Sequence, residues 1–510
     1  MIRFFRKYHK WLGIIFAFII LSYVFSGIIL NHRNALSGID INRKLLPEVY
    51  RYNNWNNAAV KATLRISPDS VLLYGNTGIW LTDSAFSSFT SFGKGFPKGI
   101  DNHRVFQVVM TKEGKLLAGA FSGLFSYSSD EGKWTSIDIP VRDRRVVDIS
   151  CKNDTMLILT RSYLLKSADL KEFAVMQLPP PENYDNKTGL FKTLWVIHSG
   201  EIYGLTGKLI IDFAGLVFAF LTISGLIVFI NKIVLKKEGV RAEKRKKLKS
   251  SNRWNLRWHN KLGWIMLAIL ILNTVTGMFL RPPLLAFIGN SRVGKIPFTE
   301  LADSNPWFDQ LRRIFYDEES GRFILSTSEG FFYSDDDFGS DLKKYVHQPP
   351  ASIMGVTVLE KTHSSTFLIG SFEGLFLWNS QNGRVFDYIT KQEYEGKSGF
   401  GSPVGDYLIS GFTRDFSGQE FYFDYNRGAL PVSGYGEFAP MPRQIREEST
   451  MSLWNVALEI HTGRIWQPLI GGFYVLIVPL TGLIVLFILI SGFIVWLKLR
   501  KAETSNDTDP

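Results

Sequence analysis

Four long apolar stretches constrain this 510-residue chain more than any other feature of its sequence. They span residues 11–30, 209–230, 264–280 and 473–496. Each is close to the roughly 20 helical residues that cross a bilayer core of about 30 Å. Long polar segments separate the second stretch from the first and the fourth from the third. The pattern predicts a bundle of four transmembrane helices with two large segments outside the bilayer.

Basic residues gather beside the ends of these stretches. They lie at positions 3–10, in a run from 232 to 257, and at 498–501. The positive-inside rule then places both termini and the central run in the cytoplasm and the two long segments outside. The first stretch is longer than a signal peptide core and has no clear cleavage site after it, so we expect an uncleaved anchor. The basic residues behind the net charge of +11 are thus explained by orientation in a lipid bilayer, and no nucleic-acid partner is expected.

The sequence contains an internal duplication. "YHKWLG" at 8–13 matches "WHNKLG" at 258–263, and "LLAGAFSGLF" at 116–125 matches "FLIGSFEGLF" at 367–376. "IHSGEIYG" at 197–204 matches "IHTGRIWQ" at 460–467. Both halves begin on the same side of the membrane, so they form a parallel repeat with a pseudo-twofold axis along the membrane normal. Equivalent residues should therefore face each other at equal depth.

The external segments contain a shorter period. Strand-like runs recur about every 40 to 44 residues, three times in each segment, with turn signals after them. This predicts an external all-β domain, a six-bladed β-propeller split three plus three; two separate small β or α+β domains are the alternative. The expected domains are 1–31 (first helix, cytoplasmic N-terminus), 32–195 (blades 1–3), 196–231 (second helix), 232–258 (basic cytoplasmic loop), 259–283 (third helix), 284–455 (blades 4–6), 456–498 (fourth helix) and 499–510 (cytoplasmic tail).

Five of the eight histidines flank the apolar stretches: His9, His32, His198, His259 and His461. The repeat pairs His9 with His259 at the cytoplasmic side and His198 with His461 outside. Two imidazoles presented by different helices of a bundle are what a haem iron with two axial histidines needs. His32 is a third external candidate, and a helix from His9 to His32 rises about 34 Å, so each membrane face could hold one haem.

Other interpretations of these residues stay open at this stage. A histidine at a membrane boundary is often only an interfacial polar group, like Trp11 or Trp258 in the aromatic belt. His103, His347 and His363 are most simply surface or turn residues. The repeated glycines could leave space for a porphyrin face or let helices approach closely; they are Gly13, Gly27, Gly225, Gly263, Gly277 and Gly492.

Several classes of function are disfavoured. Cys151 is the only cysteine, so covalent haem attachment, disulfides and iron–sulfur sites are excluded within the chain. The apolar stretches hold no acidic residue beyond Asp212, which argues against a proton-coupled transporter. No nucleotide-binding glycine fingerprint follows a strand in a cytoplasmic segment, so electrons would have to come from a separate cytoplasmic or quinol donor.

The "YHKWLG…SGIILNHR" opening, its "WHNKLG…TGMFL" copy and the two "IH" motifs resemble the PepSY-associated transmembrane helix family, over about a third of the chain. That family includes bacterial inner-membrane proteins similar to di-haem ferric-siderophore reductases. The resemblance implies two b-type haems, one bound by His9 and His259, the other by His198 and His461 or by His32. The sequence departs from this family in the external segments. Family members usually carry PepSY-type α+β modules there, whereas this chain has β repeats.

These observations lead to one expectation and one rival. We expect a multi-pass protein of the bacterial inner membrane, with a periplasmic β domain, that passes electrons through two haems to an external ferric chelate or siderophore. Reduction would release the metal, because Fe(II) is softer than Fe(III) and is held less well by hard oxygen ligands. The rival is a membrane-anchored propeller that binds or regulates a partner and has no redox activity.

Overall fold

The computed structural model describes residues 2–506 except 87, 290, 353–354, 395, 397–404 and 417. The chain forms two compact units. The helical unit contains Met1–Leu36, Asn186–Asp303 and Leu453–Pro510; the β unit contains Ser37–Asp185 and Ser304–Ser452. Each unit is therefore built from both halves of the duplicated sequence.

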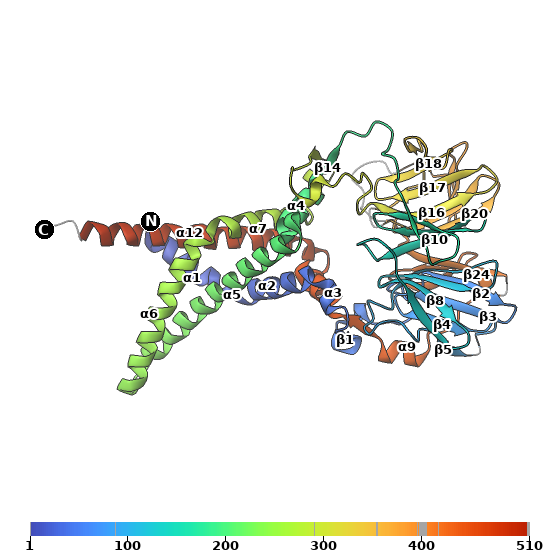
Figure 1. Ribbon diagram of the computed structural model, residues 1–510. Helices are drawn as coiled ribbons and strands as arrows, with labels where there is room; N and C mark the ends of the chain where they lie inside the picture. Colours follow the sequence, from blue (N-terminus) through green and yellow to red (C-terminus); the bar gives the residue numbers. More distant parts are fainter. Residues whose placement is uncertain are drawn as a thin grey trace. The chain divides into compact units, whose positions relative to one another are not determined.

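The helical unit consists mainly of helices that pack lengthwise (Figure 1). They are α1 (Ile2–Ile15), α2 (Ala17–Asn31), α4 (Leu190–Ser199), α5 (Gly204–Leu235), α6 (Ala242–Ile265), α7 (Leu267–Phe279), α10 (Leu453–His461) and α12 (Ile477–Asn506). Shorter elements connect them: α3 (Arg33–Leu36), α8 (Leu285–Ile288), α11 (Gln467–Ile470), η3 (Glu201–Tyr203), η4 (Glu300–Ala302), η5 (Arg464–Trp466) and η6 (Gly471–Leu476). Strand β14 (Lys187–Gly189) pairs with β15 (Arg292–Gly294) in an antiparallel two-stranded sheet.

Among the described residues, two helical segments are by themselves long and apolar enough to cross a membrane, Glu201–Leu235 and Arg464–Lys498. The pairs α1–α2 and α6–α7 meet the same test only when each pair is taken as one span, and they bend by 61° and 65°. The stretches 11–30 and 264–280, expected to be single helices, are therefore broken, at Phe16 and at Met266. Both breaks have nearly the same backbone angles, with φ near −90° and ψ of 0°, so the bend is duplicated with the sequence.

The basic segment 232–258, expected as a loop, is largely helical. Helix α5 continues to Leu235 and α6 begins at Ala242. Lys, Arg and Glu are good helix formers, and Glu243 pairs with Lys247 one turn later at 2.7 Å. The charged side chains of this stretch remain in solvent.

The helix contacts repeat with the duplication. Helix α1 packs on α12 as α6 packs on α5, and α2 packs on α10 as α7 packs on α4. The pseudo-twofold relation also links the α2–α5 contact to the α7–α12 contact. A shared apolar core lies between these helices and includes Ile20, Ala214, Val217, Leu221, Leu270, Val485, Ile488 and Leu489.

In the described residues, the β unit contains six antiparallel sheets of three or four strands. Those of the first external segment are β2–β5 (Ala62–Ser67, Ser70–Gly75, Gly78–Thr82, Phe89–Ser91), β6–β9 (Val105–Met110, Leu116–Ala120, Gly123–Ser128, Lys133–Ile137) and β10–β13 (Val146–Lys152, Thr155–Thr160, Leu164–Ser167, Ala174–Met176). Those of the second are β16–β19 (Leu311–Asp317, Arg322–Thr327, Gly330–Ser334, Lys343–Lys344), β20–β23 (Val356–His363, Thr366–Ser371, Gly374–Asn379, Val385–Asp387) and the three-stranded β24–β26 (Ile409–Phe416, Gln419–Asp424, Gly428–Pro431).

Smaller elements complete the β unit. Strand β1 (Asp40–Asn42) pairs with β27 (Thr450–Ser452), so the first and last residues of the unit lie side by side. The remaining elements are η1 (Arg43–Leu45), η2 (Glu48–Tyr50) and α9 (Arg443–Glu448).

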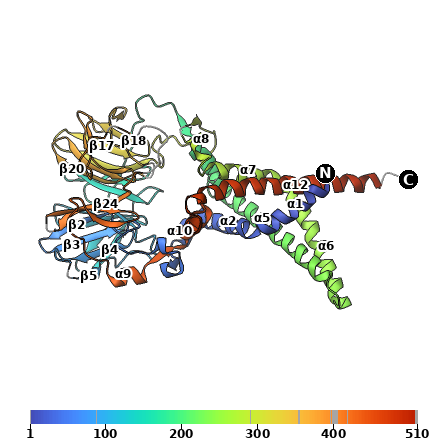
Figure 2. The same cartoon turned by 180° about the vertical axis from the view of Figure 1, so that it is seen from behind.

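The first strands of the six sheets contact one another in sequence order. Strand β24 also contacts β2, and these two strands lie side by side in Figure 2. Apolar clusters follow the same order. One cluster lies between each sheet and the next along the chain, and a further cluster joins the last sheet to the first. Both external segments thus form one unit with shared cores.

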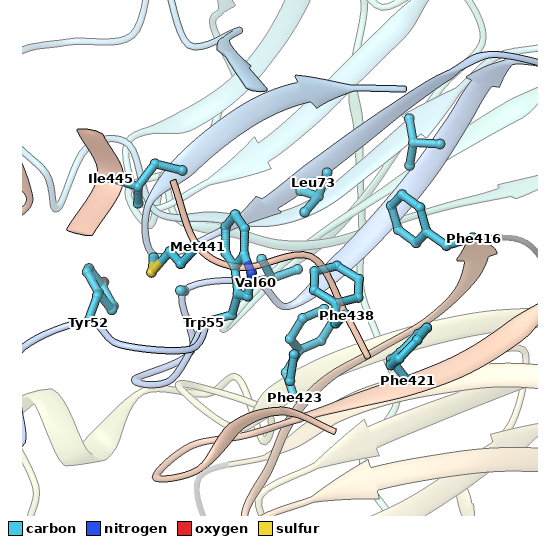
Figure 3. Packing of buried hydrophobic residues seen from close by; sticks show 13 residues of the cluster. Tyr52, Trp55, Val60, Leu73, Phe416, Phe421, Phe423, Phe438, Met441 and Ile445 are labelled. Atoms are coloured by element: carbon cyan, nitrogen blue, oxygen red, sulfur yellow. The ribbon is translucent and has the colours of Figure 1, made fainter. Parts of the chain in front are cut away.

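The cluster between the last and first sheets shows how this junction is held (Figure 3). Trp55 is fully buried and donates its indole N–H to the carbonyl of Ala439 at 2.7 Å. The ring of Phe438 packs edge-on against Trp55 and against Phe421 and Phe423 of β25. Buried aromatic rings of this size dominate the stability of such a core.

Candidate functional site: two facing pairs of histidines

The first candidate site is a facing pair of histidines, His9 on α1 and His259 on α6. Their ring centroids are 6.1 Å apart and their planes are at 90°. The two residues occupy equivalent positions of the repeat, 250 residues apart. The fold therefore brings together the two side chains that the sequence predicts as one pair.

Each imidazole of this pair is fixed through Nδ1. His9 Nδ1 lies 2.9 Å from the carbonyl oxygen of Ile488 on α12, and His259 Nδ1 lies 2.9 Å from Ser224 Oγ on α5. A carbonyl can only accept, and Ser224 already donates its hydroxyl hydrogen to Leu221 O at 3.0 Å. Both Nδ1 atoms must then carry the hydrogen, which leaves the lone pair on Nε2.

The second candidate site is the pair of His198 on α4 and His461 on α10. Their ring centroids are 6.0 Å apart and their planes are at 52°. His198 Nδ1 lies 2.9 Å from the carbonyl oxygen of Asn273, and His461 Nδ1 lies 3.1 Å from that of Tyr23. The same argument leaves Nε2 of both rings as the free nitrogen.

All four histidines dock on one short pattern, a hydroxyl residue followed by glycine. The pattern is Ser491-Gly492 beside His9, Ser224-Gly225 beside His259, Thr276-Gly277 beside His198 and Ser26-Gly27 beside His461. In each case the histidine comes from one half of the chain and the hydroxyl–glycine pair from the other. Neither half alone could position its histidines this way.

The glycines of this pattern make room for the imidazoles. A Cβ added at Gly277 would lie 2.7 Å from His198 Cε1, and one at Gly492 would lie 2.9 Å from His9 Cε1. The corresponding distances are 3.2 Å from Gly27 to His461 and 3.8 Å from Gly225 to His259. A Cβ at Gly277 or Gly492 would therefore force the imidazole to shift, and one at Gly27 would require it to give by a few tenths of an ångström.

The other two repeated glycines differ. A Cβ at Gly13 would meet no atom within 4 Å, and one at Gly263 would be 3.9 Å from Leu221. Each stands three residues before a helix break, a place where glycine eases a bend.

His32, the third external candidate, pairs with a carboxylate. Its Nε2 lies 2.6 Å from Asp212 Oδ2 on α5, and Asn31 Nδ2 donates to the other carboxylate oxygen at 2.8 Å. Asp212 is 8% exposed, so this acid is buried and satisfied by two polar neighbours. The interactions described for His32 thus hold its Nε2 at Asp212.

The centroid separations of the facing rings fit one metal ion between the rings of each pair. Two imidazoles that hold a metal through Nε2 at about 2 Å on opposite sides have centroids roughly 6 Å apart, since the ring centre lies about 1.1 Å behind the nitrogen. The observed 6.1 and 6.0 Å fit this spacing. Within the described part of the chain, no group of three or more His, Cys, Asp or Glu side chains could hold a metal ion by itself. An ion held at one of these pairs would need further ligands besides the two imidazoles.

Sequence reasoning missed the acceptors of the four Nδ1 atoms and the partner of His32. The carbonyls of Ile488, Asn273 and Tyr23 are backbone groups that any residue could supply. The repeated hydroxyl–glycine pairs were a usable signal, because they recur at four places in the apolar stretches.

Helices that span a membrane, an all-β unit and histidines facing in symmetric pairs define a duplicated membrane protein with two candidate ligand sites. The chain belongs to the family described as PepSY-associated TM region, which matches residues 2–232 and 182–499. No curated protein matches the chain.

Some solved structures are similar at low identity. The extracellular domain of BT4673 from B. thetaiotaomicron, described as a hybrid two component system, is 12% identical, with 75% of this chain and 48% of that chain covered and a TM-score of 0.24. PorZ, a surface component of the type-IX secretion system of Porphyromonas gingivalis, is 10% identical, with 71% and 37% covered and a TM-score of 0.30. The chain spans less than half the length of either protein, and likenesses of this degree carry no argument about its function.

Proposed function

We propose that the helical unit holds two b-type haems, one between His9 and His259 and one between His198 and His461. The observation that carries the proposal is the pair of ring separations, 6.1 and 6.0 Å, together with Nδ1 atoms that donate and Nε2 atoms that keep their lone pairs. A haem would supply four ligands from its own ring, and the two histidines of a pair would complete the iron site. His32 is left out of the ligand set because Asp212 engages its Nε2.

The chain's own residues would hold and tune such a group. When bound, a haem of this kind supplies a one-electron couple between Fe(III) and Fe(II). The Nδ1 hydrogen bonds fix each imidazole in orientation and raise the basicity of Nε2, as second-layer contacts do for metal-bound histidines. The hydroxyl–glycine pairs let every imidazole lie against the neighbouring helix, where its rotation is restricted.

The two sites are separated along the bundle. Met278, the neighbour of Gly277 beside His198, contacts Gly482 in α12, whereas His9 packs against Ser491 and Gly492 of the same helix. Ten helical residues, from 482 to 492, rise about 15 Å. Two sites spaced in this way along the bundle support a role in carrying electrons through it.

We propose further that the β unit is a single six-bladed propeller on the periplasmic side of a bacterial inner membrane. The ring of contacts from β2 through β24 and back to β2 supports the propeller, as do the six apolar clusters between consecutive sheets. The exposed basic residues of α6 support cytoplasmic placement of that helix and of both termini.

The activity that this arrangement supports best is reduction of an external ferric chelate, such as a ferric siderophore, with electrons from a cytoplasmic or quinol donor. One electron converts each Fe(III) to Fe(II), which hard oxygen ligands hold less tightly. The Fe(II) would then leave the chelating ligand, and the donor would return one electron to the protein.

The test uses the full chain purified in detergent from cells supplied with haem. We expect two haems per chain, a Soret band, and sharp α and β bands after reduction. The reduced protein should then be reoxidised by ferric citrate or by a ferric trihydroxamate, with one Fe(II) formed per electron. A colourless protein from such cells would favour the rival, a membrane-anchored binding or regulatory protein. A coloured protein that neither chelate reoxidises would support the haem proposal and contradict reduction of a ferric chelate.

A further inference from the structure

Three consecutive sheets of the β unit begin next to a cation. Lys61 directly precedes β2, Arg104 directly precedes β6 and Arg145 directly precedes β10. These strands contact one another in that order, so the three side chains start from neighbouring positions of the same face. We call Lys61, Arg104 and Arg145 the cation cluster.

The side chains of the cluster pack against aromatic rings. The Lys61 ammonium lies 3.9 Å from the centre of the Phe106 ring, and the Arg145 guanidinium lies 5.0 Å from that of Phe121. Burial and the charges of Arg104, Arg313 and Arg145 hold the pKa of Lys61 well below its usual range. The positive charges of this region therefore repel one another at close quarters.

The guanidinium groups of the cluster are left incompletely satisfied. Within the part of the chain that the structure describes, Nε of Arg104 and Nε of Arg145 are buried and have no hydrogen-bond partner. The nearest carboxylate to Arg104 is Asp101, at 3.7 Å, which is beyond hydrogen-bond length. A buried donor without an acceptor costs free energy, so these groups are expected to find an acceptor in the working protein.

The acids near Arg145 are engaged elsewhere. Asp143 accepts the backbone N–H groups of Arg145 and Arg161, and Asp309 accepts Arg161 Nε at 2.6 Å. They reduce the local positive charge, but neither supplies the acceptor that Arg145 Nε lacks.

Another arginine of the same unit, Arg313, has a side chain that is 14% exposed and an acceptor for each of its guanidinium nitrogens. Arg313 on β16 donates to Asp148 Oδ2 at 3.0 Å, to Thr357 O at 3.1 Å and to Gln107 Oε1 at 3.4 Å. It thereby ties β16 to β10, β20 and β6. The cation cluster lies beside this arginine without a comparable set of acceptors, so a purely structural role explains Arg313 and leaves the cluster unexplained.

We propose that the cation cluster binds the oxyanion groups of a small molecule, carboxylates or phosphates, where strands β2, β6 and β10 begin. Arginine forms short charge-assisted hydrogen bonds with both groups, and lysine adds a compact charge. A bound oxyanion supplies the missing acceptors and relieves the repulsion among the three cations. The proposal concerns binding and does not depend on haem in the helical unit.

The test is calorimetric titration of the full chain in detergent at low ionic strength, with citrate and with inorganic phosphate as probes. We expect saturable binding of at least one probe, and the preferred probe identifies carboxylate or phosphate as the ligand group. Arg145→Gln and Lys61→Met should each weaken that binding at least tenfold. Arg144→Gln is the matched control, because Arg144 is the exposed neighbour of Arg145 and pairs with Asp138 at the surface; it should bind as the wild type does.

Folding of the variants is checked by thermal unfolding with and without the probe. The probe should raise the Tm of the wild type and of Arg144→Gln and leave that of Lys61→Met nearly unchanged. Absence of saturable binding of both probes at millimolar concentration would overturn the proposal. So would equal loss of affinity in Arg144→Gln and Arg145→Gln, since that result means general surface attraction.

Discussion

The imidazole rings of His9 and His259 face each other with centroids 6.1 Å apart, although 250 residues separate them in the chain. His9 is oriented by Ile488, near the end of the second half, and His259 by Ser224, in the first half. Each ring is thus placed by the opposite repeat. The site exists only where both copies of the duplicated hairpin are folded together.

The first prediction concerns the ligand pairs. His9→Ala and His259→Ala should each lower the haem content from two per chain to about one, and both should remove the same haem, because one iron loses an axial ligand in either variant. Redox titration of the α band identifies the haem that remains. His32→Ala is the control and should keep both haems, since Asp212 engages that imidazole. Loss of different haems in the two variants would contradict the pairing.

The second prediction concerns the glycines that face the imidazoles. Gly277→Ala places a Cβ 2.7 Å from His198 Cε1, so the ring must move. Overpacking of this kind costs about 1–3 kcal/mol, which corresponds to a roughly 5- to 150-fold loss of affinity for the haem between His198 and His461. Haem retention during dilution in detergent measures it.

Gly225→Ala is the matched control for this prediction, because its Cβ would lie at an ordinary 3.8 Å from His259. This variant should retain the haem between His9 and His259 as the wild type does. Equal haem loss in both variants would show that helix packing, and not contact with the imidazole, makes glycine necessary.

Much of this arrangement could be predicted from the sequence because duplication carries its own geometry. Matching His9 with His259 and His198 with His461 needs only an offset, and a parallel repeat then places each pair face to face. The regular spacing of strand-like runs likewise predicted repeated β sheets, and six sheets are present in the described residues.

The helix breaks and the hydrogen-bond partners could not be predicted in this way. Residues 11–30 contain no charged residue, and Phe16 is flanked by apolar residues, so nothing in hydropathy marks Phe16 as a break. The acceptors of His9, His198 and His461 include backbone carbonyls, whose positions depend on how the helices pack. A single basic residue before a strand, such as Arg145, resembles any surface residue until its burial is known.

The third prediction concerns the ion pair that joins the two external segments. Asp148 on β10 is buried and accepts Arg313 Nε at 3.0 Å and the backbone N–H of Ile314 at 2.8 Å. Asp148→Asn removes the charge that compensates Arg313, which costs about 3–5 kcal/mol when a buried pair loses one partner. Denaturant unfolding of the β unit, followed by tryptophan fluorescence, measures the loss.

Asp154→Asn is the control for Asp148→Asn. Asp154 pairs with Lys112 at 2.8 Å, but both side chains are largely exposed, and such pairs contribute at most about 1 kcal/mol. A loss below 1 kcal/mol in Asp148→Asn would mean that Arg313 does not depend on this carboxylate.

The fourth prediction concerns the sign of a stability change at Lys61. Replacing a residue that serves the structure destabilises the fold. Replacing a cation that its neighbours repel, and that serves binding, should stabilise the fold. Lys61→Met keeps an unbranched side chain, shorter by one atom, and removes a charge that Arg104, Arg313 and Arg145 repel. In anion-free buffer at neutral pH we expect a gain of about 1 kcal/mol, or roughly 2–4 °C in Tm.

The pH dependence of this gain is a further check. The pKa of Lys61 is lowered in the folded state, so between that lowered pKa and the usual lysine pKa near 10.5 the unfolded chain binds more protons than the folded one. Stability of the wild type therefore rises with pH through this window, while Lys61→Met lacks the effect. The difference in Tm between the two proteins should be largest at neutral pH and shrink as the pH approaches 10. A constant difference, or a Lys61→Met protein less stable than the wild type at neutral pH, would show that the ammonium has a structural partner.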